Sequence, residues 1–144
     1  MVIQTGKPKA VAWVRGEGRL RGSVTFYPVH EGTLVAAEIF GLPQTDTGFF
    51  AFHIHEGGSC GGKDFADTGG HLNPGGKPHP EHMGDLPPLL AKNGRAYMAV
   101  ETGRFTPEDV IGHTVVIHMD PDDFHTQPAG NAGKKIACGV IRRI

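Results

Sequence analysis

The sequence predicts an all-β fold, an antiparallel sandwich or barrel of about eight strands with long loops. Apolar and polar residues alternate with a period of two through much of the first half of the chain. Glycine (22 residues) and proline (11 residues) are frequent enough to indicate many turns. We find no segment with convincing helical periodicity, and 144 residues fit a single domain, residues 1–144, that can bury a core.

The first four strands are expected at Val11–Gly16, Leu20–Val29, Thr33–Leu42 and Gly48–Glu56. Turn-like sequences that contain glycine, RGEGR and HEG, separate the first three of these strands. Farther along, Asn93-Gly94 is a strong signal for a two-residue hairpin that joins two more strands. The last two strands are expected at Gly112–Asp120 and in the C-terminal segment KKIACGVIRRI.

A long segment between these strands, Gly57–Asp85, has no periodicity. A connection of roughly thirty residues without structure is unusual inside a compact domain, so it is either disordered or held by other means. Its prolines reduce the entropy of the unfolded chain, but they cannot fix the fold alone. The sequence therefore raises the question of what orders this segment.

The charge balance carries no signature of a nucleic-acid or membrane partner, since the net charge is -1 and 20% of residues are charged. No apolar run approaches the roughly 20 residues that a membrane-spanning helix needs. The N-terminal segment MVIQTGKPKAVAWV lacks an uninterrupted apolar stretch, so we do not expect it to be a signal peptide.

The nine histidines are the most informative residues. His53 and His55 are two residues apart on an expected strand, so their side chains point to the same face. Two imidazoles on one face can bind one metal ion, although an exposed surface pair has the same spacing. His118 ends another apolar strand, where a lone histidine is more often structural. Together with the pair it favours copper, which binds several imidazoles.

The loop carries a second group of possible ligands, His71, His79, His82 and Asp85. Three imidazoles and one carboxylate suit zinc in a tetrahedral site. A metal ion would also order the loop that supplies its ligands. The alternative is a solvated loop that happens to be rich in histidine. The other histidines, His30, His113 and His125, are interpreted as surface or packing residues.

The two cysteines, Cys60 and Cys138, lie far apart in the sequence. They are either two free buried thiols or one long-range disulfide. A disulfide over that loop would stabilise the fold by about 4 kcal/mol in the chain-entropy model.

These motifs together resemble the copper/zinc superoxide dismutase family, in particular its bacterial branch. The resemblance covers the chain from Val11 to the C-terminus. The motifs that carry it, in chain order, are FHIHEGGSC (Phe52–Cys60), GGHLNP (Gly69–Pro74), HMGDLP (His82–Pro87), VVIHMDPDD (Val115–Asp123) and GNAGKKIACGVI (Gly130–Ile141). It implies an eight-stranded Greek-key β-sandwich, in agreement with the strands expected from the alternation.

The resemblance also implies residue roles. The copper ligands would be His53, His55, His71 and His118, and the zinc ligands would be His71, His79, His82 and Asp85. His71 would thus bridge the two ions. Asp122 would link a copper-binding imidazole to a zinc-binding one and orient both. Cys60 and Cys138 would form the disulfide of the family.

The activity implied is the dismutation of superoxide to dioxygen and hydrogen peroxide. Copper would alternate between two oxidation states, and zinc, which has no redox chemistry, would organise the loop. The family has an arginine near the copper where this sequence has Lys135. Lysine keeps the positive charge that steers an anion but lacks the planar fork, so we expect retained but more salt-sensitive activity.

The alternative function is a non-catalytic copper- and zinc-binding protein of the same fold, for storage or delivery. Loss of a copper ligand would favour it, and none is lost. The sequence leaves open a homodimer and a protein that donates copper. It also leaves the compartment open: the resemblance implies an extracytoplasmic bacterial protein whose leader is removed, whereas the sequence alone also allows the cytoplasm.

Overall fold

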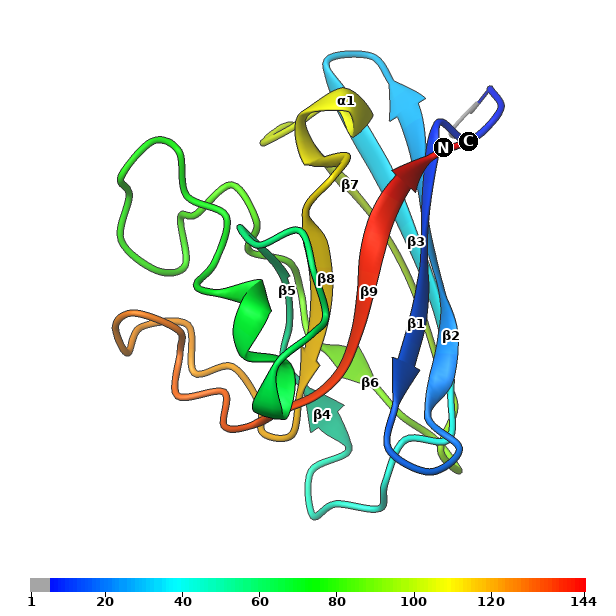
Figure 1. Ribbon diagram of the computed structural model, residues 1–144, viewed down its shortest axis with the longest axis vertical. Coiled ribbons are helices and arrows are strands. Elements are labelled where there is room, and N and C mark those ends of the chain that lie inside the picture. Colours follow the sequence, from blue (N-terminus) through cyan, green and yellow to red (C-terminus); the bar gives the residue numbers. More distant parts are fainter. Residues whose placement is uncertain (1–5) are drawn as a thin grey trace.

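Seven strands form one curled antiparallel sheet in the computed structural model, which describes residues 6–144 (Figure 1). They are β1 (Ala10–Gly16), β2 (Arg21–Val29), β3 (Gly32–Phe40), β5 (Phe52–His55), β7 (Ala96–Thr102), β8 (Thr114–His118) and β9 (Lys135–Arg143). Their order across the sheet is β5-β8-β9-β1-β2-β3-β7, so the chain crosses between the two ends of the sheet after β3 and after β7. These crossovers and the antiparallel neighbours confirm the predicted all-β fold.

Two further strands, β4 (Phe49–Phe50) and β6 (Leu89–Leu90), pair with each other. β4 leads directly into the edge strand β5, and β6 precedes the other edge strand, β7. The pair therefore connects the two ends of the curled sheet as in a barrel.

The alternation predicted most strands to within two residues of their observed ends, but it missed one division. The expected strand Gly48–Glu56 is split at Ala51, which makes nine strands in the described residues. The chain changes partner there: β4 pairs with β6, whereas β5 pairs with β8. Ala51 itself donates to Asp120 O (2.9 Å) and accepts from His118 N (2.9 Å). Its partners lie far away in the sequence, so the local pattern did not indicate the break.

The expected hairpin at Asn93-Gly94 is confirmed. Both residues have positive φ angles, 54° and 77°. Lys92 and Arg95 on either side exchange two backbone hydrogen bonds (2.8 and 3.1 Å). This is the backbone conformation that an Asn-Gly pair accommodates at low cost.

Two short helices correct the expectation that the chain has none. α1 (Pro107–Val110) is a single turn, and Thr106 and Asp109 cap it with their side chains. The sequence Thr106-Pro107-Glu108-Asp109 is a readable capping box with proline at the first helical position. η1 (Lys63–Thr68) is a 3-10 segment within the long loop. Within the described residues no helix is long and apolar enough to cross a membrane.

The core lies inside the curled sheet, where Phe26, Phe50, Phe52 and Ile54 have no exposed surface. Burial alternates along β1 and β3, because one face of these strands meets solvent. In contrast, every residue of β5 and β8 is buried. Their outer faces must therefore be covered by something other than the sheet.

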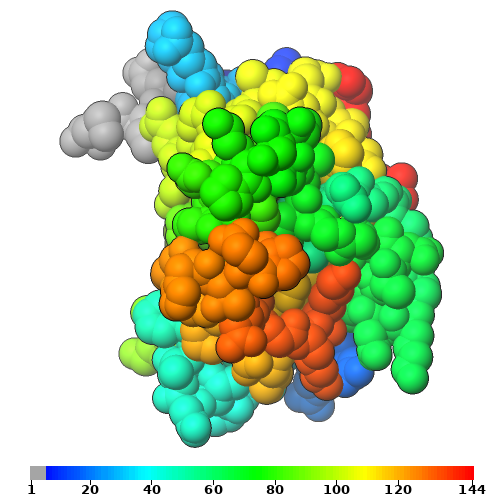
Figure 2. Space-filling view, turned by 90° about the vertical axis from the view of Figure 1, so that its left-hand side faces the viewer, coloured from blue at the N-terminus to red at the C-terminus, as the bar shows by residue number. Residues whose placement is uncertain are grey.

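The cover is provided by two loops, residues 57–85 and residues 119–134, which lie side by side on one face of the molecule (Figure 2). The first loop runs along the free edge of β5. Ile54 N donates to Gly84 O and Leu72 N donates to Ile54 O, both at 2.8 Å, and Glu56 N donates to Gly70 O at 2.8 Å. A side chain on Gly84 would collide with the carbonyl of Ile54. Backbone pairing with an edge strand is thus one source of the order that the sequence left unexplained.

A disulfide also ties this loop to the sheet, in this case by a covalent bond. Cys60 is bonded to Cys138 in β9, with 5.8 Å between the two Cα atoms, across 78 residues of sequence. The pairing implied by the family resemblance is therefore confirmed. In the chain-entropy model a closed loop of this length stabilises the fold by about 4 kcal/mol.

Candidate metal centre

The His53 and His55 side chains lie together on the outer face of β5. The neighbouring residues Phe52 and Ile54 point into the core, as the period of a strand requires. The ring centroids of His53 and His55 are 6.3 Å apart, and both rings are buried. The predicted common face is confirmed, whereas the alternative of an exposed pair is wrong.

His118 joins this pair from the end of β8. The register between β8 and β9 shifts between Ile117 and His118, an irregularity of the kind that redirects a side chain. His118 Nε2 lies 3.1 Å from His55 Nε2. His71 approaches from the loop, where it forms an isolated bridge with His55, and its ring centroid is 3.9 Å from that of His53.

These residues form a first cluster, in which one nitrogen of each of four imidazoles lies within 4.8 Å of the others. Its members are His53, His55, His71 and His118. All four are buried. They come from two strands and the loop, and the structure brings together the whole set that the sequence predicted for copper.

A second cluster surrounds the carboxylate of Asp85. His71 Nδ1 lies 2.9 Å from Asp85 Oδ1. The Nδ1 atoms of His79 and His82 lie 3.1 and 3.2 Å from Asp85 Oδ2. His82 Nδ1 is also 3.1 Å from His71 Nδ1. Three imidazole nitrogens and a carboxylate thus face one point, which is the set that the sequence predicted for zinc.

The two clusters overlap at His53 as well as at His71. In a third group of four, the possible ligand atoms also lie within 4.8 Å of one another. This group contains His53, His71, His79 and Asp85, without His82. The hydrogen bonds separate the sets, because His53 Nε2 is occupied by Asp122 and only its Nδ1 is free. That Nδ1 belongs with the four-imidazole cluster, and His82 completes the cluster around Asp85.

Three buried ring nitrogens have no hydrogen-bond partner among the described residues: His53 Nδ1, His71 Nε2 and His79 Nδ1. His79 Nδ1 is near Asp85 but does not have the geometry of a hydrogen bond. A buried polar atom without a partner costs about 1–3 kcal/mol. All three atoms face the interior of a cluster, so metal ions there would remove this cost, and the donor sets fit copper and zinc.

Asp122 sets the tautomers of two of these rings. Its Oδ2 accepts from His53 Nε2 (2.7 Å), and its Oδ1 accepts from His79 Nε2 (2.8 Å). With the protons on Nε2, both Nδ1 atoms carry free lone pairs. Burial raises the pKa of the Asp122 carboxyl, but the hydrogen bonds from His53 and His79 outweigh it and lower that pKa. Asp122 is therefore ionised at neutral pH.

Backbone carbonyls set the tautomers of two more rings. His55 Nδ1 donates to Gly69 O (2.8 Å) and His118 Nδ1 donates to Gly133 O (3.2 Å). Burial lowers the pKa of His55 to about 2 and that of His118 to about 3. Both rings are thus neutral at pH 7, with lone pairs on the two Nε2 atoms that face each other, as metal ligation requires.

The half-buried Lys135 lies at the edge of the first cluster. Its Nζ donates to Thr68 Oγ1 (2.7 Å) and to Gly69 O (3.0 Å). Burial lowers the pKa of Lys135. Because Gly69 O also accepts from His55, the lysine supports the backbone that orients one ring of the cluster.

The three remaining histidines lie outside both clusters. His30 and His125 are exposed, and His113 donates from Nδ1 to Glu56 O (2.7 Å) near the surface. Their interpretation as surface or packing residues is confirmed.

Sequence reasoning missed residues that hold the clusters without joining them. Gly130 is one: a side chain there would collide with the Asp122 carboxylate and the His79 ring. Its φ of 73° is also a conformation that favours glycine. The sequence GNAG hinted at a special backbone position. Arg104 and Gln127, which hold the turn at His79, had no recognisable signal.

Comparison with known proteins identifies a family to which the sequence is similar. The family model "Copper/zinc superoxide dismutase (SODC)" matches residues 20–141. The chain belongs to this family. "Superoxide dismutase [Cu-Zn] 2" of Aquifex aeolicus is 37% identical to it, over 90% of this chain and 83% of the relative. "Superoxide dismutase [Cu-Zn]" of Deinococcus radiodurans is 36% identical, over 88% of this chain and 80% of the relative.

A solved structure, described as the crystal structure of "the clock protein EA4", has the same fold as this copper/zinc superoxide dismutase family member. It aligns over the whole of both chains with a TM-score of 0.82 and 31% sequence identity.

Proposed function

We propose that this protein dismutates superoxide to dioxygen and hydrogen peroxide, with copper held by His53, His55, His71 and His118 and zinc held by His71, His79, His82 and Asp85. The observation that carries the proposal is the position of His71. Its Nε2 is buried without a partner in the first cluster. Its Nδ1 contacts Asp85 (2.9 Å) and His82 (3.1 Å) in the second.

No other ring of the first cluster can serve both sites. His53, His55 and His118 each use their second nitrogen for Asp122, Gly69 O or Gly133 O. Only His71 has both nitrogens directed at possible metal positions. His71 would therefore connect the proposed copper site to the proposed zinc site.

Bound copper supplies the one-electron chemistry of the dismutation. His71 Nε2 has no hydrogen-bond partner in the described residues, so this atom could take a proton when it is not a ligand. The other three rings have their protons fixed on the far nitrogen, so they remain neutral lone-pair donors. Lys135 provides positive charge at the edge of the cluster, where it attracts a small anion.

Metal analysis combined with a dismutation assay tests the proposal. After loading with both metals, we expect one copper and one zinc per chain and rapid loss of superoxide. His118→Ala, which removes a ligand of the copper set alone, should abolish activity and leave zinc binding. Zinc binding without activity in the copper-loaded parent protein would refute the enzymatic function and favour storage or delivery.

We further propose a homodimer, a protein that donates copper, and a location outside the cytoplasm. The exposed side chains of Phe49 and Leu90, which are cross-strand partners in β4 and β6, support a homodimer. The burial of the first cluster supports delivery of copper by a partner. The disulfide between Cys60 and Cys138 supports an oxidising compartment. Sedimentation of the metal-loaded protein tests the homodimer.

A further inference from the structure

The turn that carries two ligands of the proposed zinc set is held from outside by two side chains. We call residues 79–82 the zinc turn. It contains His79 and His82, and it begins with a proline-containing sequence, His79-Pro80. Because proline has no N–H, this turn has fewer backbone groups to hold itself together. One backbone hydrogen bond closes the turn: Glu81 N donates to the carbonyl of Pro78, the residue before the turn, at 2.7 Å.

Gln127, from the loop that follows β8, binds both backbone polar groups of His79. Its Oε1 accepts from His79 N (2.8 Å), and its Nε2 donates to His79 O (2.8 Å). This paired contact resembles the exchange of hydrogen bonds between two strands. It fixes the orientation of the peptide groups on both sides of the His79 ring.

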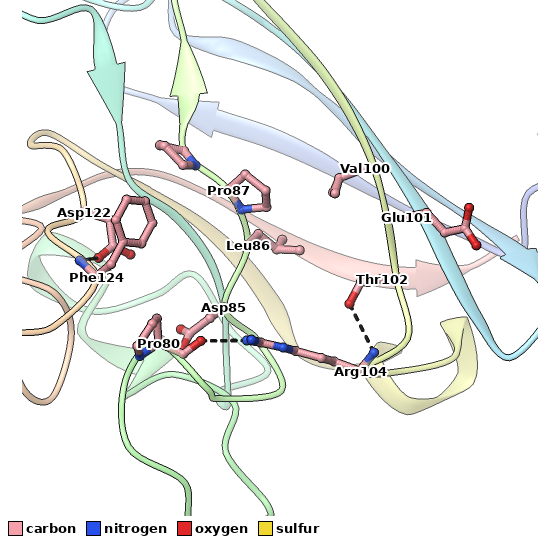
Figure 3. A pocket seen from close by; sticks show the side chains of 11 residues that line it. Pro80, Asp85, Leu86, Pro87, Val100, Glu101, Thr102, Arg104, Asp122 and Phe124 are labelled. Atoms are coloured by element: carbon pink, nitrogen blue, oxygen red, sulfur yellow. Dashed lines mark hydrogen bonds between the residues drawn. The ribbon is translucent and has the colours of Figure 1, made fainter. Parts of the chain in front are cut away.

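Arg104, from the segment after β7, binds two carbonyls farther along the zinc turn. Its Nη1 donates to Pro80 O (2.7 Å) and to His82 O (3.0 Å). Figure 3 shows the Arg104 side chain extended across a cavity toward Pro80, close to Asp85. The cavity has a volume of about 360 Å³ and is lined by Arg104, Asp85 and Asp122 among others. The backbone of Arg104 is itself anchored, because its N donates to Thr102 Oγ1 (3.1 Å).

We infer that Arg104 and Gln127 are positioning residues for zinc: they preset the zinc turn so that His79 and His82 need little reordering when the ion binds. This inference rests on the proposed zinc set. Neither side chain makes a hydrogen bond to a ring nitrogen of that set. Both bind the backbone of the turn, and Gln127 Nε2 also donates to His125 O in its own loop (3.0 Å). We call the side chains of Arg104 and Gln127 the clamps. A ligand backbone that is already ordered reduces the entropy cost of binding, so the clamps raise zinc affinity without adding a ligand.

The two clamps reach the turn from different segments, so their contributions are expected to be largely independent. Removal of an outer-shell partner typically weakens metal binding 10- to 100-fold. Since these clamps act on the backbone, we expect about 10-fold for each and about 100-fold for both together.

The test measures the zinc dissociation constant of the copper-free protein by competition with a chromophoric chelator. Arg104→Ala removes the Nη1 donor of both bonds to the turn, and Gln127→Ala removes the paired contact. The matched controls are Arg19→Ala and Gln44→Ala, at exposed positions away from the turn. Hydrogen exchange of the zinc-free protein reports directly on the turn, where the His79 amide should exchange faster in Gln127→Ala.

The outcomes separate this inference from the proposed function. If the parent protein binds no zinc, the proposed zinc set is wrong. If it binds zinc and the clamp variants stay within twofold of the controls, the clamps have no positioning role. Gln127→Glu keeps the bond from His79 N and loses the bond to His79 O, so an intermediate affinity supports the inference. An affinity for zinc as low as that of Gln127→Ala, or an equal loss of copper affinity in every clamp variant, would overturn it.

Discussion

Replacing Asp122 by asparagine should remove one metal ligand without touching a metal site directly. In the structure the two carboxylate oxygens accept from His53 Nε2 and His79 Nε2, at 2.7 and 2.8 Å. An asparagine side chain has one acceptor oxygen and one donor NH2 group. It can accept from only one of the two rings.

The second ring must then accept a hydrogen bond from the NH2 group. If that ring is His79, its proton moves to Nδ1, which is the atom that faces the proposed zinc site. If it is His53, the proton moves to the atom that faces the proposed copper site. A protonated nitrogen cannot bind a metal ion, so one of the two sites loses a ligand.

The magnitude follows from the bonds that are lost. A hydrogen bond to a charged partner contributes about 1.5–3 kcal/mol. That corresponds to roughly a 10- to 100-fold loss of affinity, the range observed for partners of metal-binding histidines. We therefore expect Asp122→Asn to lower the affinity of the protein for one of the two ions by about that factor. Dismutase activity should fall in parallel.

Separate competition titrations with zinc and with copper measure the effect. Asp123→Asn is the matched control, because the Asp123 carboxylate contacts Thr126 and His125 and neither cluster. The reasoning would be refuted if Asp122→Asn bound both ions within about threefold of the parent protein. It would also be refuted if Asp123→Asn produced the same loss.

Two further predictions concern pH and the substrate. The metal-free protein should lose about 2.7 kcal/mol of stability between pH 7.5 and 5.5 from His55 and His118 together, since each loses about 1.4 kcal/mol over this whole interval. The sign follows because burial lowers their pKa to about 2 and 3, whereas the unfolded chain takes up protons near pH 6.5. Denaturant unfolding at both pH values checks this, and a metal-free protein that gained stability in acid would contradict it. Lys135→Ala should slow dismutation and make its rate less dependent on salt concentration. Lys134→Ala, at the exposed neighbouring position, should have a smaller effect on both the rate and its salt dependence. An unchanged rate with an unchanged salt dependence would exclude the steering role of Lys135.

The strands and the paired histidines could be predicted because their signals are local. A period of two identifies a strand with one buried face, and it also places His53 and His55 on one side of that strand. The break at Ala51 could not be predicted, because it depends on which distant segments pair with the residues on each side. The clamps at Arg104 and Gln127 were missed for a similar reason, since a polar residue in a loop does not indicate its partner.

The order of the long loop has several causes, and they act on different parts of it. The loop is paired with β5 through Gly70 and Leu72 near its centre and through Gly84 near its end. These bonds require no metal ion. The segment between Leu72 and Gly84, which carries His79 and His82, lacks such pairing, and the side chains of Arg104 and Gln127 hold its backbone. Metal ions therefore do not have to fold the whole loop. They would have to draw together only side chains whose backbone is already in place, which explains how a segment rich in proline and glycine could present the four proposed zinc ligands to one ion.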